Sequence, residues 1–235
     1  MTSKKRQLSI TFPNTWGGRR KSAGRPRLAP RPRVPHTRRP KLASRFPVHV
    51  TVRLRAGLPR LRGFELAKVL RRAFVHGCDA GVFRICQFSV QGNHIHLVCE
   101  ARDKTALSRG VQGFKVRVAR GLNRHWGRNG TVFDDRYHAE IMKTPRHVRN
   151  TLLYVLHNGA RHGEKLPRWA SGIDPFSSAW YFDGWRDTRW RNGLSPPPNE
   201  DSPPVAQPHT WLLATGWRRA GLLGVTELPA AAARS

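Results

Sequence analysis

Residues 91–100 read QGNHIHLVCE, and this stretch decides how the sheet is built. Gln91-Gly92-Asn93 supplies a turn, and the apolar run after it predicts a strand. Side chains alternate across a strand, so His94 and His96 share one face and the apolar residues next to them share the other. The apolar face is typical of a core. The other face sets two imidazoles side by side, where they form either half of a metal site or a structural pair.

Working outward from this strand, hydrophobic periodicity predicts six further elements. The clearest is a helix over 103–126, in which apolar residues step by four, three, four and four positions. In chain order the predicted elements are a strand over 47–53, a helix over 61–78, strands over 82–90 and 94–101, a helix over 103–126, a strand over 130–142 and a helix from 144 to about 158. The first six predict an α+β fold: a ferredoxin-like antiparallel sheet with helices on one face.

The charge of the chain indicates a polyanionic partner. Lys and Arg number 43 against 14 Asp and Glu, a net charge of +29, which favours nucleic acid and is also compatible with an anionic membrane surface. No apolar run approaches the ~18 residues of a membrane-spanning helix, and no signal peptide opens the sequence, so we expect no membrane partner. Three cysteines without CxxC spacing favour a reducing, cytoplasmic setting.

Composition divides the chain into three parts. Residues 1–45 hold 14 Lys/Arg and no Asp or Glu, which predicts a disordered basic tail that contacts DNA. Residues 46–163 are globular. Residues 164–235 form a Trp- and Pro-rich C-terminal extension, and its tryptophans are either packing anchors or platforms on which bases of single strands stack. The arginines of the tail expected to contact DNA are Arg19, Arg20, Arg25 and Arg27.

A second candidate segment is TLLYVLHNGARHG, residues 151–163. On a helix, Tyr154 and Asn158 lie one turn apart on one face. Two neutral imidazoles and an amide suit Mn²⁺ well and Mg²⁺ adequately, and leave coordination positions for phosphate oxygens. A tyrosine phenol can attack phosphorus to give a covalent phosphotyrosine. The pattern therefore indicates phosphodiester cleavage, with His94, His96 and Asn158 as metal ligands.

With these residues the sequence resembles the single-tyrosine HUH transposases, in particular the REP-associated tyrosine transposases. His94-Ile95-His96 matches the family's His-hydrophobic-His, and Tyr154-x-x-x-Asn158 falls where the family has its nucleophile and third ligand. NGTVFDDRYHAEIMKTP, residues 129–145, is similar to the strand before the tyrosine helix, and residues 16–26 are similar to the family's basic leader. One departure is Gly159, where many members have proline.

The resemblance implies an HUH nuclease fold and an enzyme that cuts and rejoins single-stranded DNA, often beside a short hairpin. It implies Mg²⁺ or Mn²⁺, a 5′-phosphotyrosine, a free 3′-hydroxyl and a place with the bacterial nucleoid in the cytoplasm. It leaves open a monomer or a homodimer. Beyond the tail, the expected DNA contacts are Arg117, Arg120 and Arg124 on the 103–126 helix and Arg136 on the following strand.

The chain has three tyrosines, and we predict Tyr154 as the nucleophile over Tyr137 and Tyr181. Tyr137 lies on a predicted strand without a ligand at helical spacing, and nothing near Tyr181 resembles a ligand set. Three other functions stay open: a replication-initiator or relaxase-like nicking enzyme, a domesticated DNA-binding regulator that no longer cleaves, and a basic RNA-binding protein, which would leave the His and Tyr set without a purpose.

Overall fold

The computed structural model describes residues 39–77, 81–161, 172–192 and 203–227. Within them, one sheet has four antiparallel strands in the order β2-β3-β1-β4. This is the ferredoxin-like order, so the predicted fold is confirmed. The strands are β1 (Val48–Arg53), β2 (Phe83–Val90), β3 (His94–Ala101) and β4 (His138–Ile141).

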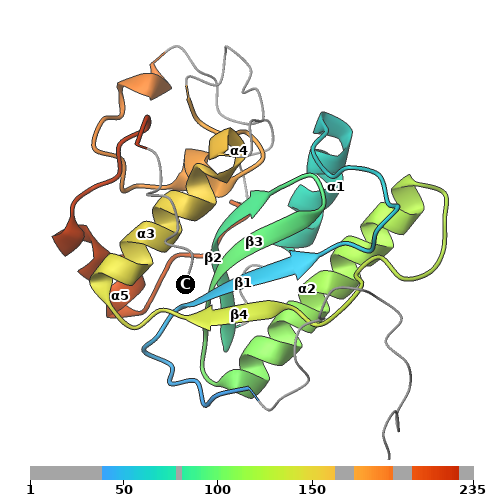
Figure 1. Cartoon of the computed structure of the whole chain (residues 1–235), viewed down its shortest axis with the longest axis horizontal. Helices are drawn as coiled ribbons and strands as arrows, with labels where there is room; N and C mark the ends of the chain where they lie inside the picture. Colours follow the sequence, from blue (N-terminus) through green and yellow to red (C-terminus); the bar gives the residue numbers. More distant parts are fainter. Residues whose placement is uncertain (1–38, 78–80, 162–171, 193–202, 228–235) are drawn as a thin grey trace, which may run out of the picture. The chain divides into compact units, whose positions relative to one another are not determined.

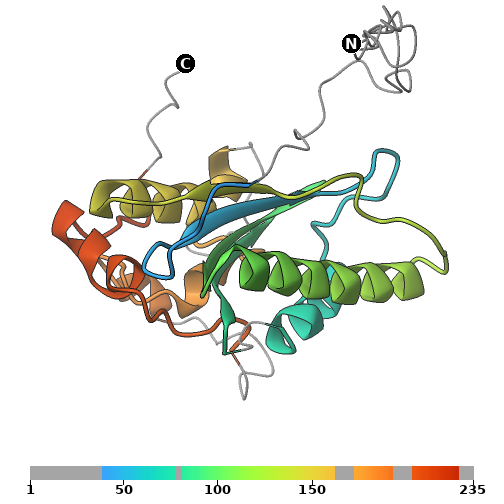
Figure 2. The same cartoon turned by 90° about the horizontal axis from the view of Figure 1, so that it is seen from below.

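Helices cover both faces of this sheet. The helices α1 (Phe64–Val75) and α2 (Lys104–His125) share one face, and α3 (Pro145–Leu156) lies across the other, as Figures 1 and 2 show from two directions. The predicted apolar face of β3 packs under α1 and α2 together with alternate residues of β1 and the apolar stripe of α2. The strand's period of two therefore leaves the histidines of β3 on the face that α3 covers.

The structure differs from the sequence prediction in two places that matter for the site. The strand expected over 130–142 is confined to β4. Before it, Phe133 forms only an isolated bridge with Leu54, and the backbone oxygens of Asp135 and Tyr137 accept from the side chains of Lys115 and Arg39, at 2.9 and 2.7 Å. The helix expected to run through Asn158 ends at Leu156, and a short helix, α4 (Asn158–Arg161), begins after His157.

The described part of the C-terminal segment closes the outer edge of β2. The backbone N–H of Val90 donates to the Phe176 oxygen at 2.8 Å, and that of Ala206 donates to the Ile85 oxygen at 2.9 Å. An open strand edge would expose such groups to pairing with other chains. Val205 and Ala206 of this Pro-rich segment are accordingly buried.

The same segment also packs against α3. It contributes η2 (Ser178–Tyr181), η3 (Arg189–Arg191), α5 (Trp211–Ala214) and η4 (Gly216–Ala220). Trp185 and Trp217 are buried in one apolar cluster with α3, which is the packing role considered for the tryptophans. Trp211 is 51% exposed, so its ring remains accessible.

Three further sequence expectations concern the tail arginines, the cysteines and membrane-spanning helices. The tail arginines Arg19, Arg20, Arg25 and Arg27 lie outside the described residues. Cys86 and Cys99 are buried, and neither belongs to a disulfide among the described residues. Among the helices of the described residues, none is long and apolar enough to cross a membrane.

Glu100 at the end of β3 should be a main anchor of the C-terminal segment. It is 3% exposed and accepts hydrogen bonds from the backbone of His209 and from the backbone and hydroxyl of Thr210, all within 2.8 Å. Glu100→Ala removes three hydrogen bonds to a buried carboxylate, so we expect the free energy of unfolding in urea to fall by about 3 kcal/mol. Glu65→Ala, which removes an exposed carboxylate paired with Lys68, should change it by less than ~0.5 kcal/mol. Equal effects of the two substitutions would contradict this.

Candidate active site

The pairing of β1 with β3 builds a polar patch on the face under α3. Thr51 lies directly opposite His96 in the register, and Arg53 lies opposite His94. The rings of His94 and His96 are 4.7 Å apart between centroids and meet edge to face. The two histidines predicted from sequence are therefore neighbours, and His96 is buried.

One nitrogen of each histidine is committed to the protein. Nδ1 of His96 lies 3.0 Å from Nε2 of His49 and 3.1 Å from Oγ1 of Thr51, and Nδ1 of His94 lies 2.8 Å from the Asn93 side-chain oxygen. Metal-binding histidines are commonly held in this way, with the second nitrogen engaged by a neighbouring acceptor. The arrangement makes Nε2 of each ring the nitrogen that would face a metal ion.

His49 is the residue that sequence analysis missed. Burial lowers its pKa to about 4, with smaller contributions from the nearby His138 and His147. The ring is therefore neutral at physiological pH, and its Nε2 can accept the Nδ1 proton of His96. Such a bond selects the His96 tautomer whose Nε2 carries a lone pair. The signal was present in PVHVTVR, where His49 and Thr51 share the polar face of their strand, but the partner strand was needed to place them.

Tyr154 comes from α3 and lies against these rings. Its ring centroid is 5.2 Å from that of His96 and 6.0 Å from that of His49, both at steep interplanar angles. The N-terminus of α3 is fixed by Thr144, whose hydroxyl accepts from the backbone of His147 at 3.2 Å, with Pro145 in the first turn. The structure thus brings the predicted nucleophile and the predicted ligand pair together from two elements.

Asn158 occupies the first position of α4, which packs against β2. It is fully buried, and neither its amide oxygen nor its amide nitrogen has a hydrogen-bond partner among the described residues. A buried amide without a partner carries a cost of about 1–3 kcal/mol, which a bound ligand would offset.

The donor set fits a divalent metal ion. Two imidazole nitrogens and one amide oxygen suit Mn²⁺ or Mg²⁺. Among the described residues, no three His, Cys, Asp or Glu side chains form a group that could hold a metal, so a metal site here would need a further donor such as the Asn158 amide predicted from sequence.

The other two tyrosines lie elsewhere. Tyr137 is buried beneath the Arg39 guanidinium, 3.5 Å from the ring centroid, and lines a pocket of about 400 Å³ with Lys115 and Arg136 beside α2. The hydroxyl of Tyr181 accepts a hydrogen bond from Arg71 at 2.7 Å. No contact described for either tyrosine joins it to the histidines.

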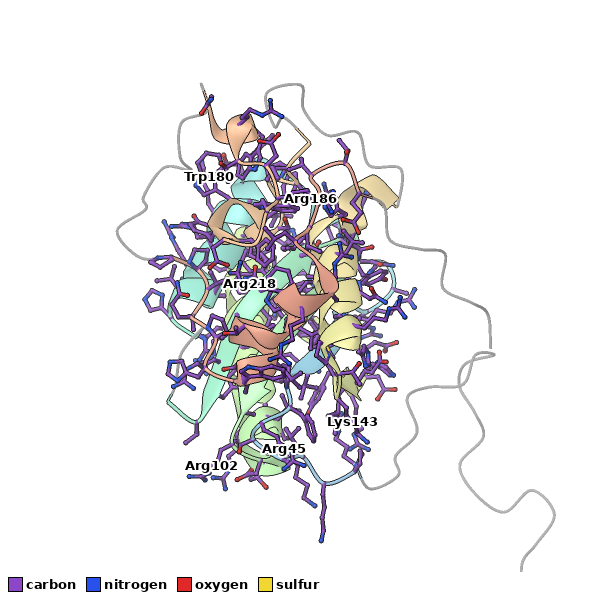
Figure 3. All side chains as sticks on the ribbon, turned by 90° about the vertical axis from the view of Figure 1, so that its left-hand side faces the viewer. Arg45, Arg102, Lys143, Trp180, Arg186 and Arg218 are labelled. Atoms are coloured by element: carbon purple, nitrogen blue, oxygen red, sulfur yellow. The ribbon has the colours of Figure 1, made fainter. Side chains whose placement is uncertain are left out.

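The predicted DNA-contacting arginines do not gather at the histidines. Arg120 and Arg124 are exposed on α2, across the sheet from Tyr154, whereas Arg117 is half-buried and its guanidinium packs on Gly77. Arg136 lines the pocket beside α2. Figure 3 shows further cationic side chains on another side: Arg186 near Trp180, Arg218 midway, and Arg45, Arg102 and Lys143 at the opposite end.

Comparison with known proteins gives one family. Residues 44–158, about half of the chain, match the family model described as "Transposase IS200 like". A REP-associated tyrosine transposase bound to a REP hairpin is similar in structure, with a TM-score of 0.49 and 19% identity over 62% of this chain and 82% of that one. A putative transposase from Deinococcus radiodurans has a TM-score of 0.35 and 15% identity over 57% of this chain and 99% of that one. No curated protein matches.

The buried neutral ring of His49 should make the stability of the fold depend on pH. Its pKa is about 4 in the folded chain and ~6.5 when unfolded, so between these values the unfolded state binds more protons. The stabilisation is complete above pH ~6.5 and is lost as pH falls towards 4, by up to about 3 kcal/mol.

His49→Gln should flatten this part of the curve of unfolding free energy against pH, measured by urea denaturation. His125→Gln, at an exposed position on α2, should leave it unchanged. If the slope persists in His49→Gln, another group is responsible.

Proposed function

Through residues 44–158 the chain belongs to the IS200-like transposase family, and from this premise we propose that it cuts and rejoins single-stranded DNA beside a hairpin, through a 5′-phosphotyrosine on Tyr154. The observation that carries the proposal is the contact of Tyr154 with His96. A phenol that could attack phosphorus lies there against an imidazole that could bind the metal. His94, His96 and Asn158 would hold Mg²⁺ or Mn²⁺.

The reaction divides between the metal and the side chains of the chain. When bound, the metal ion supplies positive charge at the scissile phosphate. The Tyr154 oxygen attacks phosphorus, forming a Tyr–O–P bond as the bond from phosphorus to the 3′-oxygen breaks. The phenol proton is lost and the 3′-oxygen gains one, so a free 3′-hydroxyl leaves. His49 and Thr51 keep His96 in one tautomer, and the reverse attack by a 3′-hydroxyl rejoins DNA.

Domain roles and DNA contacts follow from the same proposal. We assign catalysis to residues 46–163, DNA contact to the tail over 1–45, and a supporting role to the extension over 164–235. Exposed Arg120 and Arg124 are suited to phosphates away from the cleavage point, and Arg136 in its pocket to a nucleotide beside α2. Arg117, which packs on Gly77, is the weakest candidate of the four.

Tyr154→Phe is the first test. The variant lacks the attacking oxygen but keeps the ring, so it should bind hairpin DNA as the wild type does, form no covalent adduct and cut nothing. Labelled single-stranded hairpin DNA on a native gel reads binding, and the same DNA incubated with Mn²⁺ and resolved on a denaturing gel reads the adduct and the cut strand. Tyr181→Phe is the matched control and should keep wild-type adduct yield. An adduct formed by Tyr154→Phe would remove this tyrosine from the reaction, and DNA binding without cleavage by the wild type would favour a regulator.

The second test concerns the ligands. His94→Ala and His96→Ala should each lower the cleavage rate at least ~100-fold, while hairpin affinity changes little, because the ligands act at the scissile phosphate. Chelation by EDTA should stop the wild type, and added Mn²⁺ should restore it. His125→Ala on α2 serves as the control. Cleavage that persists in EDTA would exclude the metal from the mechanism.

A further inference from the structure

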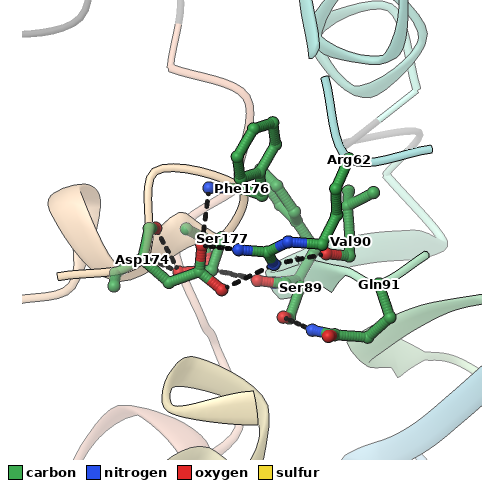
Figure 4. Close-up of polar contacts among 10 residues, drawn as sticks. Arg62, Ser89, Val90, Gln91, Asp174, Phe176 and Ser177 are labelled. Atoms are coloured by element: carbon green, nitrogen blue, oxygen red, sulfur yellow. Dashed lines mark hydrogen bonds and ion pairs between the residues drawn. The ribbon is translucent and has the colours of Figure 1, made fainter. Parts of the chain in front are cut away.

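A buried ion pair joins the C-terminal segment to the body of the domain beside Asn158. Arg62, in the loop before α1, forms two parallel bonds with Asp174, Nη1 to Oδ2 and Nη2 to Oδ1, both 3.0 Å (Figure 4). The side chains are 6% and 2% exposed. A pair this deeply buried recovers little net stability after its desolvation cost, so its geometry is more informative than its energy.

The pair holds the end of β2. Nη1 of Arg62 also donates to the Val90 oxygen at 3.0 Å, and its guanidinium lies 4.5 Å from the centre of the Phe176 ring. Asp174 accepts from the backbone of Phe176 at 3.0 Å, and the Phe176 oxygen in turn accepts from Val90 at 2.8 Å. Val90 is the last residue of β2, just before the turn that leads to His94. Figure 4 shows Arg62 between the Asp174 carboxylate and the Val90 oxygen.

The pair also lies directly against the backbone that follows Asn158. A Cβ built on Gly159 would overlap the Oδ2 atom of Asp174 and would lie 3.1 Å from Nη1 of Arg62. Only glycine fits here, which accounts for Gly159 at a position where the resemblance leads one to expect proline. The buried Asn158 amide has no hydrogen bond to the described residues, so the position of its backbone and the packing around it set where it points.

We propose that Arg62 and Asp174 are positioning residues for the metal site. The pair packs against Gly159, which fixes the neighbouring Asn158. It also bonds Val90, which fixes the turn that leads to His94. The inference rests on the proposed function, since it takes Asn158 as a ligand. It makes the C-terminal segment, which lies beyond the family match over 44–158, a required part of the site. Asp174 reaches the ligand through packing and does not itself touch the metal.

The test is Mn²⁺ binding by the full chain without DNA. Binding is measured as the decrease of the EPR signal of free Mn²⁺. Wild type should bind one Mn²⁺, and His94→Ala should abolish binding. Asp174→Asn and Gly159→Ala should each weaken Mn²⁺ binding about 10- to 100-fold, the range for outer-shell partners of a metal site. Glu100→Gln is the matched control: it loosens the same C-terminal segment at the other end of β3, so it should lower the melting temperature yet leave Mn²⁺ affinity unchanged.

Each other result has a definite meaning. If wild type binds no Mn²⁺, or His94→Ala binds as well as wild type, the proposed metal site and this inference both fall. If wild type behaves as expected but folded Asp174→Asn and Gly159→Ala bind like it, only the positioning role falls. If Glu100→Gln weakens Mn²⁺ binding as much as they do, or if both variants lose the wild-type circular dichroism spectrum, the pair serves folding generally and the inference is overturned.

Discussion

The antiparallel pairing of β1 with β3 is the constraint on which the site depends. Both strands alternate with a period of two, so a register that buries Val50 opposite Leu97 necessarily sets Thr51 opposite His96 on the other face. A slip of one residue would exchange the two faces. The core and the site are therefore specified together: the apolar packing under α1 and α2 holds the histidines in place beneath α3.

A polar patch in the middle of a sheet needs a cover that satisfies it. Here the cover is α3 with Tyr154, and α3 is itself held by the C-terminal segment, since Arg149 bonds the Gly221 and Leu222 oxygens and pairs with Glu227 at 2.8 Å. The segment also closes the edge of β2 and reaches Gly159 through Asp174. The match to the family ends at residue 158, whereas Asp174, which lies against the next residue Gly159, comes from beyond it.

The sequence was sufficient for what local periodicity controls. The strand His94–Ala101 and the long helix α2 were predicted within one residue, because alternation and the spacing of Leu107 to Leu122 are local signals. The 130–142 strand was predicted too long: the backbone oxygens of Asp135 and Tyr137 accept from the side chains of Lys115 and Arg39, partners that lie outside the segment. His49 and Asp174 were not predicted for a similar reason. Each contacts a partner far along the chain, His96 and Arg62 respectively, and local sequence patterns do not indicate such a pairing.

The arginines that would attract DNA and the histidines that would bind a metal lie in different parts of the structure. The chain carries +29, yet the groups around Tyr154 include a histidine whose burial keeps it neutral, and the exposed arginines of α2 lie on the opposite side of the sheet. A cationic patch at the histidines would repel a divalent cation and weaken its binding. Imidazole and amide groups add no charge of their own when they bind a metal, while the exposed arginines of α2 still attract the phosphate backbone from the other side of the sheet. The polar face is not free of cations, since the register sets Arg53 opposite His94, so a metal here depends on the donor set rather than on the exclusion of positive charge.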